Sequence, residues 1–186
     1  MKAKGKRRGV SRQEWLAAGL EVLLDDGIDS VTVESLARSL RIAKSGFYWH
    51  FKNRQGLLQQ ILDYWTHEMT EVISKNPQVG VLQPRDRLSR IAETILQFDL
   101  TRYDLAIRQW AVHDAQAERG VRRVDRIRLK FVGQAFRELG FTGDDLEMRT
   151  MLFVCYHTWE APMFRQLSRK RRRELIDGRV ELLTRP

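Results

Sequence analysis

The stretch that decides the fold is Thr32–Leu58, TVESLARSLRIAKSGFYWHFKNRQGLL. Thr32 is a favourable N-cap for a short amphipathic helix over Val33–Leu40. A three-residue turn separates this helix from a second short one, which we expect over about Lys44–His50. Two short helices joined by so tight a turn predict a helix-turn-helix over about residues 32–51.

The residue types suit the packing that this motif needs. Ala37 is the small residue where the two helices cross. The apolar residues that can fix the crossing angle are Leu36, Leu40, Ile42, Phe47 and Phe51. The outer side of the second helix then presents Lys44, Ser45, Gly46, Tyr48 and Trp49. A helix fits the major groove of DNA, where base edges present a readable pattern, so this outer side is the expected DNA-reading surface.

Helical periodicity extends over nearly all of the chain, and strand-like alternation is missing, which predicts an all-α fold. Before the motif, Ser11 and Glu14 form a capping box for a helix that ends near Asp26. After it, helices are expected over 54–74, 85–100, 103–118, 120–139, 144–161 and 169–183. Two prolines and a glycine in residues 76–84 predict a loop, and Pro162 should end or kink its helix.

Composition excludes several classes of protein. The chain has 186 residues, of which 42% are hydrophobic, and a formal net charge of +9. It is too apolar for a disordered protein, and its longest run without polar residues, 151–156, is too short to span a membrane. The N-terminus lacks the apolar block of a signal peptide, and the single Cys155 excludes an intramolecular disulfide. We therefore expect a soluble cytoplasmic protein, without a membrane association, that has an anionic partner.

The positive charge is concentrated near the N-terminus. Residues 1–56 hold 11 Lys/Arg against 6 Asp/Glu, whereas residues 57–186 hold 22 against 18. Five basic residues lie between Lys2 and Arg8, which fits either an arm that binds nucleic acid or a solvated terminus. A second basic run, Arg169–Arg173, is more typical of a solvated helix face, and whether it has a partner stays open.

The quoted stretch resembles the DNA-binding module of TetR-type (tetracycline-repressor-like) transcriptional regulators. The strongest match is FYWHFKNRQGLL, Phe47–Leu58. The layout is also similar: a three-helix N-terminal domain, a long connecting helix, and further helices. The resemblance implies a DNA-binding domain with a basic arm over residues 1–56, and a helical ligand-binding and dimerisation domain over residues 57–186.

Carried over by position, the resemblance implies phosphate contacts from Thr32, Tyr48 and Lys52. It implies base contacts from Ala43, Lys44, Ser45 and Gly46, and from Trp49 or His50. Two positions depart from the family pattern. Arg41 stands where a turn glycine is usual, so either the turn differs or this arginine reaches the DNA backbone. Ala43 replaces a common capping serine. Gly46 is either a close-approach point for DNA or a tolerated surface glycine.

In the family the C-terminal helices form a dimer interface and a small-molecule pocket. By resemblance, the dimer helices are 120–139 and 144–161. The candidate pocket residues are Trp65, Phe98, Trp110, His113, Phe131, Tyr156 and Trp159. Aromatic residues at helical spacing are usually ordinary core, and both interpretations stay open. Cys155 and His157 are two apart, on different helical faces, so no metal site and no cofactor are expected.

The function implied is a homodimeric, sequence-specific transcriptional regulator that binds a palindromic operator in double-stranded DNA. Repression relieved by a small-molecule effector is the default, while activation, the effector, the operator and the target genes stay open. A Gly-rich phosphate loop and a Gly-x-Ser-x-Gly motif are both missing, which argues against an enzyme. The alternative is an architectural helical protein that binds DNA or RNA without sequence specificity.

Overall fold

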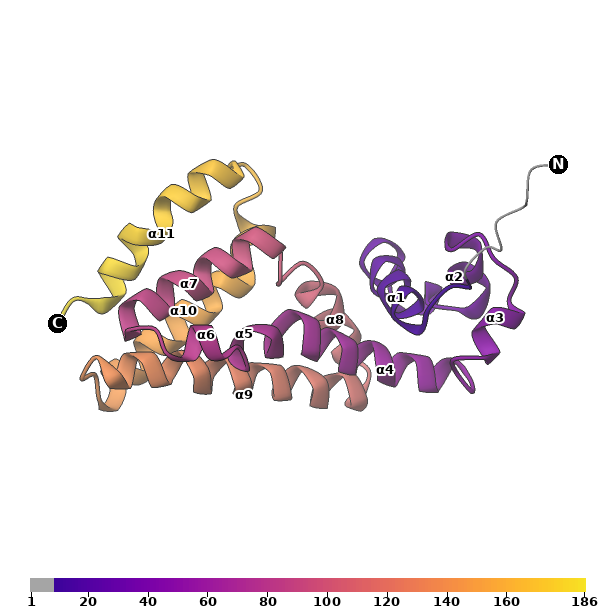
Figure 1. Cartoon of the computed structure of the whole chain (residues 1–186), viewed down its shortest axis with the longest axis horizontal. Coiled ribbons are helices and arrows are strands. Elements are labelled where there is room, and N and C mark those ends of the chain that lie inside the picture. The colour runs from indigo at the N-terminus through magenta and orange to yellow at the C-terminus, as the bar shows by residue number, and fades with distance from the viewer. Residues whose placement is uncertain (1–8) are drawn as a thin grey trace. The chain divides into compact units, whose positions relative to one another are not determined.

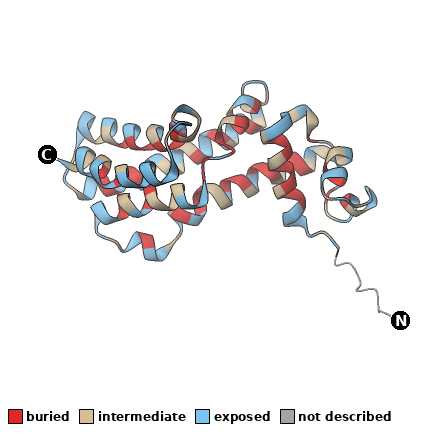
Figure 2. Cartoon of the chain, turned by 90° about the horizontal axis from the view of Figure 1, so that it is seen from above, coloured by how far each residue is buried: buried red, intermediate tan, exposed pale blue. Residues whose placement is uncertain are grey.

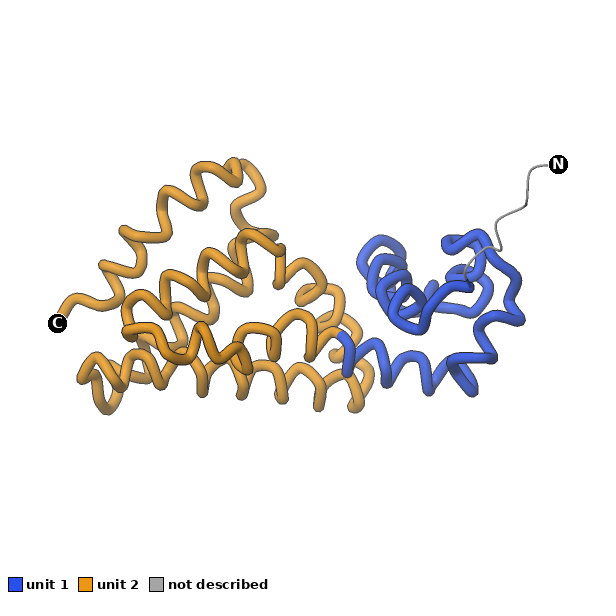
Figure 3. The backbone as a smooth tube through the Cα atoms, in the orientation of Figure 1, with its two compact units in different colours: residues 1–64 blue, residues 65–186 orange. Residues whose placement is uncertain are grey.

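The computed structural model describes residues 9–186 as helices joined by turns, with no strand in that part of the chain (Figure 1). The expected all-α fold, an N-terminal helix-turn-helix followed by a helical C-terminal part, is confirmed. The chain forms two compact units, Met1–Tyr64 and Trp65–Pro186 (Figure 3). The boundary lies inside helix α4 (Arg54–Thr66), so one continuous helix belongs to both units. The basic run Lys2–Arg8 lies outside the described residues.

The first unit contains α1, a 3₁₀ turn η1, α2, α3 and most of α4. Their bounds are Arg12–Asp26 for α1, Ile28–Ser30 for η1, Val33–Ser39 for α2 and Ser45–Tyr48 for α3. The predicted capping box of Ser11 and Glu14 is present. Thr32 caps α2 as predicted and forms a second capping box, with Ser35. The second motif helix is shorter than expected, because it begins at Ser45 without a side-chain cap.

The core of the first unit is aromatic at its centre. The rings of Trp15 and Phe47 are both fully buried and meet edge to face, with centroids 5.5 Å apart. Phe51 packs on Phe47 at 5.1 Å. At Gly19, an added Cβ would lie 2.4 Å from the Cδ1 atom of Ile61, so the glycine allows α1 to cross α4 closely. These contacts fix the frame on which α2 and α3 are held.

The second unit is a bundle of long helices around an apolar core (Figures 1 and 2). After α4, the chain continues through a π-helical segment η2 and the short helix α5, and later through the short helix α6. The bounds of these and the remaining helices are η2 (His67–Glu71), α5 (Val72–Ser74), α6 (Pro77–Gly80), α7 (Pro84–Phe98), α8 (Asp104–Ala111), α9 (Ala115–Glu138), α10 (Gly143–Met163) and α11 (Arg169–Thr184). No described helix is both long and apolar enough to cross a bilayer.

Three sequence expectations for this unit need correction. The predicted loop 76–84 contains α6, because Asn76 caps it and Pro77 occupies its first turn. The predicted helix 103–118 is interrupted, because Asp114 accepts from the backbone of Gln116 and Ala117 and starts α9 there. The predicted helix 54–74 is continuous but contains η2, a π-helical segment for which the sequence gives no periodicity signal.

The basic run Arg169–Arg173 contributes to the fold. The Arg169 guanidinium donates to the carbonyls of Leu96 and Gln97, the last turn of α7, at 2.7–3.2 Å. Arg172 donates to three carbonyls at the end of α10, those of Glu160, Ala161 and Phe164. Cations stabilise the unpaired carbonyls at helix C-termini, so these two arginines cap neighbouring helices.

Candidate functional site

The turn between α2 and α3 is closed by backbone hydrogen bonds. The N–H of Ile42 donates to the carbonyl of Ala37 at 3.0 Å, and the N–H of Arg41 donates to that of Arg38 at 3.1 Å. This is the Schellman pattern, which requires a left-handed residue just after the helix. Arg41 fills that place with φ of 55°. The turn therefore has the geometry that a glycine would adopt freely, at a cost of about 1–2 kcal/mol for an arginine.

The outer side of α3 faces solvent. Trp49 is 87% exposed and Tyr48 66% exposed, whereas Phe47, on the inner side of α3, is fully buried. Of the ten residues predicted to contact DNA, seven are exposed: Arg41, Ala43, Lys44, Ser45, Tyr48, Trp49 and Lys52. Two large aromatic side chains left in water beside a lysine form an open surface rather than a core.

Lys44 has a partner that the sequence did not indicate. Its Nζ lies 2.7 Å from Oε1 of Glu34 in the first turn of α2, and both side chains are exposed. The hydrogen bond from Lys44 holds the pKa of the Glu34 carboxyl below its ordinary value. A surface ion pair of this kind is worth little, so the lysine is easily transferred to a phosphate or a base edge.

The remaining predicted contacts are half-buried. The Nε2 atom of His50 lies 2.9 Å from the Val10 carbonyl, so His50 holds the chain just before α1. The Thr32 hydroxyl is used in the capping box of α2. A Cβ added at Gly46 would lie 3.7 Å from the Cδ1 atom of Ile42, which is an ordinary van der Waals distance. Packing within the described structure therefore does not require a glycine at this position.

Arg54 is a further residue that sequence reasoning missed. It begins α4, and its guanidinium donates to the carbonyls of Ile28 and Val31, each at 2.7 Å. These carbonyls lie in the segment that leads into α2. Arg54 thus joins the start of α4 to the helix-turn-helix. The sequence shows this arginine in FKNR, but no local pattern indicates which carbonyls it binds.

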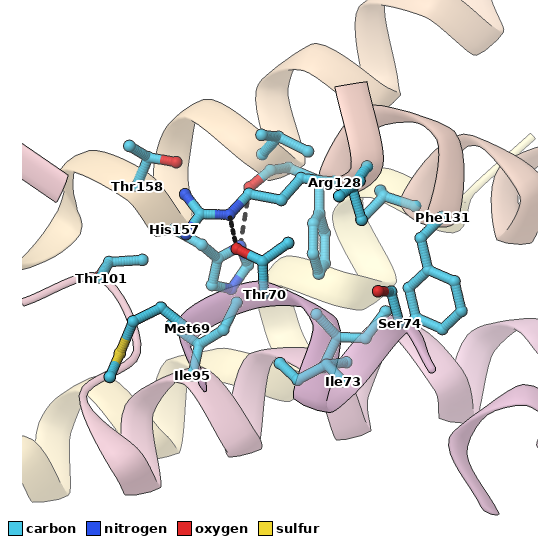
Figure 4. Close-up of a pocket in the computed structure, with 15 residues that line it drawn as sticks. Met69, Thr70, Ile73, Ser74, Ile95, Thr101, Arg128, Phe131, His157 and Thr158 are labelled. Carbon is cyan, nitrogen blue, oxygen red and sulfur yellow. Dashed lines mark hydrogen bonds between the residues drawn. The ribbon is translucent and has the colours of Figure 1, made fainter. Parts of the chain in front are cut away.

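A cavity lies inside the second unit, between η2, α5, α7, α9 and α10 (Figure 4). Most of its lining is aliphatic or aromatic, including Ile73, Ile95 and Phe131. Its polar groups are the Thr70, Thr101 and Thr158 hydroxyls, Ser74, Arg128 and His157. A largely apolar cavity with a few convergent polar groups is the usual form of a small-molecule site.

The seven predicted pocket residues do not come together. Phe131 lines this cavity, whereas Trp65 and Trp110 are buried elsewhere in the core. Phe98 borders a second hollow, and His113 and Trp159 are exposed. Tyr156 is half-buried, with the Arg179 guanidinium 4.0 Å from its ring centre. Helical spacing identifies the buried face of a helix but does not indicate which neighbouring helix covers it. For this reason most of the predicted pocket residues lie outside the observed cavity.

A buried polar network connects the cavity to α4. Arg128 forms an ion pair with Asp104 through two hydrogen bonds and donates from Nε to the Thr70 hydroxyl at 3.3 Å. Asp104 is 1% exposed and also accepts from the indole N–H of Trp65 at 3.2 Å. Trp65 lies in the last turn of α4. A residue of the cavity wall is therefore two hydrogen bonds away from the helix that enters the first unit.

His157 in the cavity wall is an uncharged imidazole. Burial, together with the Arg179 charge, lowers its pKa from 6.5 to about 3. Its Nδ1–H donates to the Phe153 carbonyl at 2.8 Å, and its Nε2 accepts from Arg179 at 3.3 Å. Within residues 9–186, no group of three or more His, Cys, Asp or Glu side chains could hold a metal ion.

Helix α10 leaves an apolar stripe uncovered. Its members recur at three- and four-residue spacing and are Met148, Met151, Leu152, Cys155, Trp159 and Met163. Contiguous exposed apolar surface of this kind is typical of a protein–protein interface. The stripe lies on one of the two helices that the sequence resemblance assigns to the dimer.

Comparison with known proteins agrees with this geometry. Residues 16–61 match the family model of bacterial regulatory proteins, tetR family. The tetracycline repressor protein class G of Vibrio anguillarum is 44% identical over 46 residues, which are 25% of this chain and 22% of the repressor. The chain thus spans about a fifth of the length of that relative. The transcriptional regulator AcuR of Cereibacter sphaeroides is 25% identical over 171 residues, 88% of this chain and 67% of AcuR.

Among solved structures, the fold is similar to that of AibR in complex with isovaleryl coenzyme A and operator DNA. The TM-score is 0.69 at 18% identity, over 94% of this chain and 98% of AibR. The sequence match thus covers the helix-turn-helix, and the structural match extends the same fold through the second unit. Residues 16–61 thus match the tetR family of bacterial regulatory proteins, and the fold of the chain is similar to that of AibR.

Proposed function

We propose that this protein is a sequence-specific DNA-binding transcriptional regulator. The observation that carries the proposal is the exposed side of α3: Lys44, Tyr48 and Trp49 face solvent while Phe47 is locked in the core. The segment that matches the tetR family includes both motif helices. Lysine and tyrosine donate hydrogen bonds to phosphates or base edges, and an exposed tryptophan can contact thymine methyl groups or sugars.

We propose further that the regulator acts as a homodimer on a palindromic operator. The apolar stripe of α10 is the proposed seam, with α9 beside it. A two-fold pair would place two α3 helices on half-sites about one DNA turn, roughly 34–36 Å, apart. The basic residues Lys2–Arg8, just ahead of Val10, are a proposed arm that adds contacts to the DNA backbone.

The proposed response to an effector runs through α4. An effector in the cavity would contact Arg128, whose partner Asp104 also holds Trp65 at the end of α4. Because α4 continues into the first unit and begins with Arg54, a shift of its last turn reaches the helix-turn-helix along one helix. An effector that binds more tightly to a conformation with α4 displaced than to the DNA-binding conformation lowers the affinity for DNA. The size of the effect is set by the ratio of its affinities for the two conformations. AibR, with isovaleryl coenzyme A and operator DNA in one complex, is a relative that binds both kinds of partner. We take relief of repression as the default outcome.

The DNA assignment is tested by competition binding with a duplex selected by the wild-type protein. Lys44→Ala should weaken binding about tenfold and Tyr48→Phe about three- to tenfold, as expected for the loss of one contact each. Lys130→Ala removes the same charge from an exposed position on α9 and should leave the affinity unchanged. Unchanged binding by both α3 variants, or equal loss for Lys130→Ala, would contradict the proposal and favour non-specific architectural binding.

A further inference from the structure

The cavity in the second unit is small. Its volume is about 50 Å³. An engineered dry cavity that binds benzene measures about 150 Å³, so the cavity as it stands takes only a molecule smaller than benzene. Figure 4 shows Met69, Ile73 and Ile95 on one side of it and Thr70 and Arg128 facing each other at the polar end.

Each charged side chain around the polar end already has a partner of opposite charge. Arg128 is paired with Asp104, and Arg179 behind His157 lies 3.8 Å from the buried Glu160. Glu71 on η2 is paired with Lys75 and Arg123. A carboxylate or ammonium group entering here would be a buried charge without a counter-charge, which is costly.

His157 does not supply a positive charge for an anionic ligand. His157 is neutral because burial and Arg179 lower its pKa to about 3. Its Nε2 faces Arg179, and its Nδ1–H is used by the Phe153 carbonyl. It therefore does not readily take up a proton to compensate an anion at neutral pH.

The free hydrogen-bonding capacity at this end consists mainly of donors. The hydrogen bonds of Arg128 to Thr70 and Asp104 use three of its five N–H groups. The hydroxyls of Thr70, Thr101 and Thr158 line the same cavity and can each donate. A ligand that fits this arrangement offers an acceptor oxygen here and apolar carbon toward Ile95 and Phe131.

We propose that the cavity takes a small, uncharged, largely apolar molecule with one hydrogen-bond-accepting oxygen, such as a short-chain ketone or alcohol. This rests on the effector role proposed above and names its ligand class. The oxygen would lie at Arg128 and Thr70. Its hydrogen bond would compete with Asp104 for the Arg128 guanidinium. A shift of Asp104 would in turn change its hydrogen bond with the Trp65 indole.

The test compares butan-2-one with propionate, which replaces a methyl group by a charged oxygen, and with propylammonium. Binding to the full chain is measured by calorimetry without DNA, so failure of the DNA assignment does not affect the result. Butan-2-one should bind at least tenfold more tightly than either ion. Tighter binding of propionate would overturn the proposal, because the guanidinium would then prefer a carboxylate, and absence of binding by all three would overturn it as well.

Two variants locate the site. Thr70→Val should weaken butan-2-one binding about three- to tenfold, because it removes one hydroxyl at the polar end. Ile95→Phe should abolish binding by filling the cavity, with circular dichroism to show that the chain is folded. The control is Thr94→Val, whose side chain lines the second hollow, and it should bind as the wild type does. Loss of binding in the control with retention in Thr70→Val would place the ligand elsewhere and contradict the proposal.

Discussion

The buried pair Asp104–Arg128 offers the sharpest test of how the second unit is held together. Asp104→Asn keeps an acceptor for the Trp65 indole but leaves the Arg128 charge without its partner in a buried site. Breaking a buried ion pair in this way costs about 3–5 kcal/mol. That is a large part of the roughly 5–15 kcal/mol by which a domain is stable.

The double variant Asp104→Asn/Arg128→Met removes both charges. It should be less destabilised than the sum of the two single variants, with a coupling of about 2–3 kcal/mol. Urea unfolding followed by circular dichroism at 222 nm measures each free energy of unfolding. The exposed pair Arg90–Glu93 is the control, and its cycle should show a coupling within about 0.5 kcal/mol. Single costs below about 1 kcal/mol that add without coupling would refute this account.

Three further predictions follow from particular residues. Arg41→Gly should stabilise the protein by about 0.5–1 kcal/mol in urea unfolding, and so should Asp99→Gly, at the other non-glycine residue with a positive φ in residues 9–186. Only Arg41→Gly should weaken DNA binding, and destabilisation by both would contradict the assigned turn geometry. The lowered pKa of His157 means that the unfolded chain binds a proton at this residue below pH 6.5, while the folded chain does so only near pH 3. The free energy of unfolding therefore decreases as the pH is lowered from 6.5 to 3. This histidine accounts for about 2 kcal/mol lost between pH 7 and 5, and His157→Gln should remove that part; an unchanged pH profile would count against a buried neutral imidazole. Leu152→Glu on the α10 stripe should convert a dimer to a monomer in analytical ultracentrifugation. Val81→Glu, at a more exposed position on the α6–α7 connection, should not, and dimers in both variants would argue against the proposed seam.

Much of the first unit could be predicted because its signals are local. The cap at Thr32, the capping box at Ser11 and the buried Phe47 each depend on a few neighbouring residues. The left-handed turn at Arg41 was not predicted: because an arginine stands where a glycine is usual, the sequence favoured either a different turn or an arginine that reaches the DNA backbone. The ion pair of Lys44 with Glu34 spans two helices, and no spacing rule indicates it.

The second unit was less predictable because its features depend on packing between distant segments. The cavity and the network from Trp65 to Arg128 join residues 39 and 24 positions apart in sequence. The π-helical segment η2 has no distinct periodicity, and the capping role of Arg169 depends on α7, more than 70 residues away. Helical periodicity predicts which segments are helical but not which helices pack against each other.

The central claim, that the outer side of α3 reads base edges, is tested most directly by selection from a random duplex pool. The wild-type protein and Lys44→Ala are selected side by side under the same salt concentration. The account predicts one enriched palindrome for the wild type, bound roughly a thousandfold more tightly than bulk DNA, and relaxed preference at the positions read by Lys44 in the variant. A pool from which neither protein enriches any motif would contradict it.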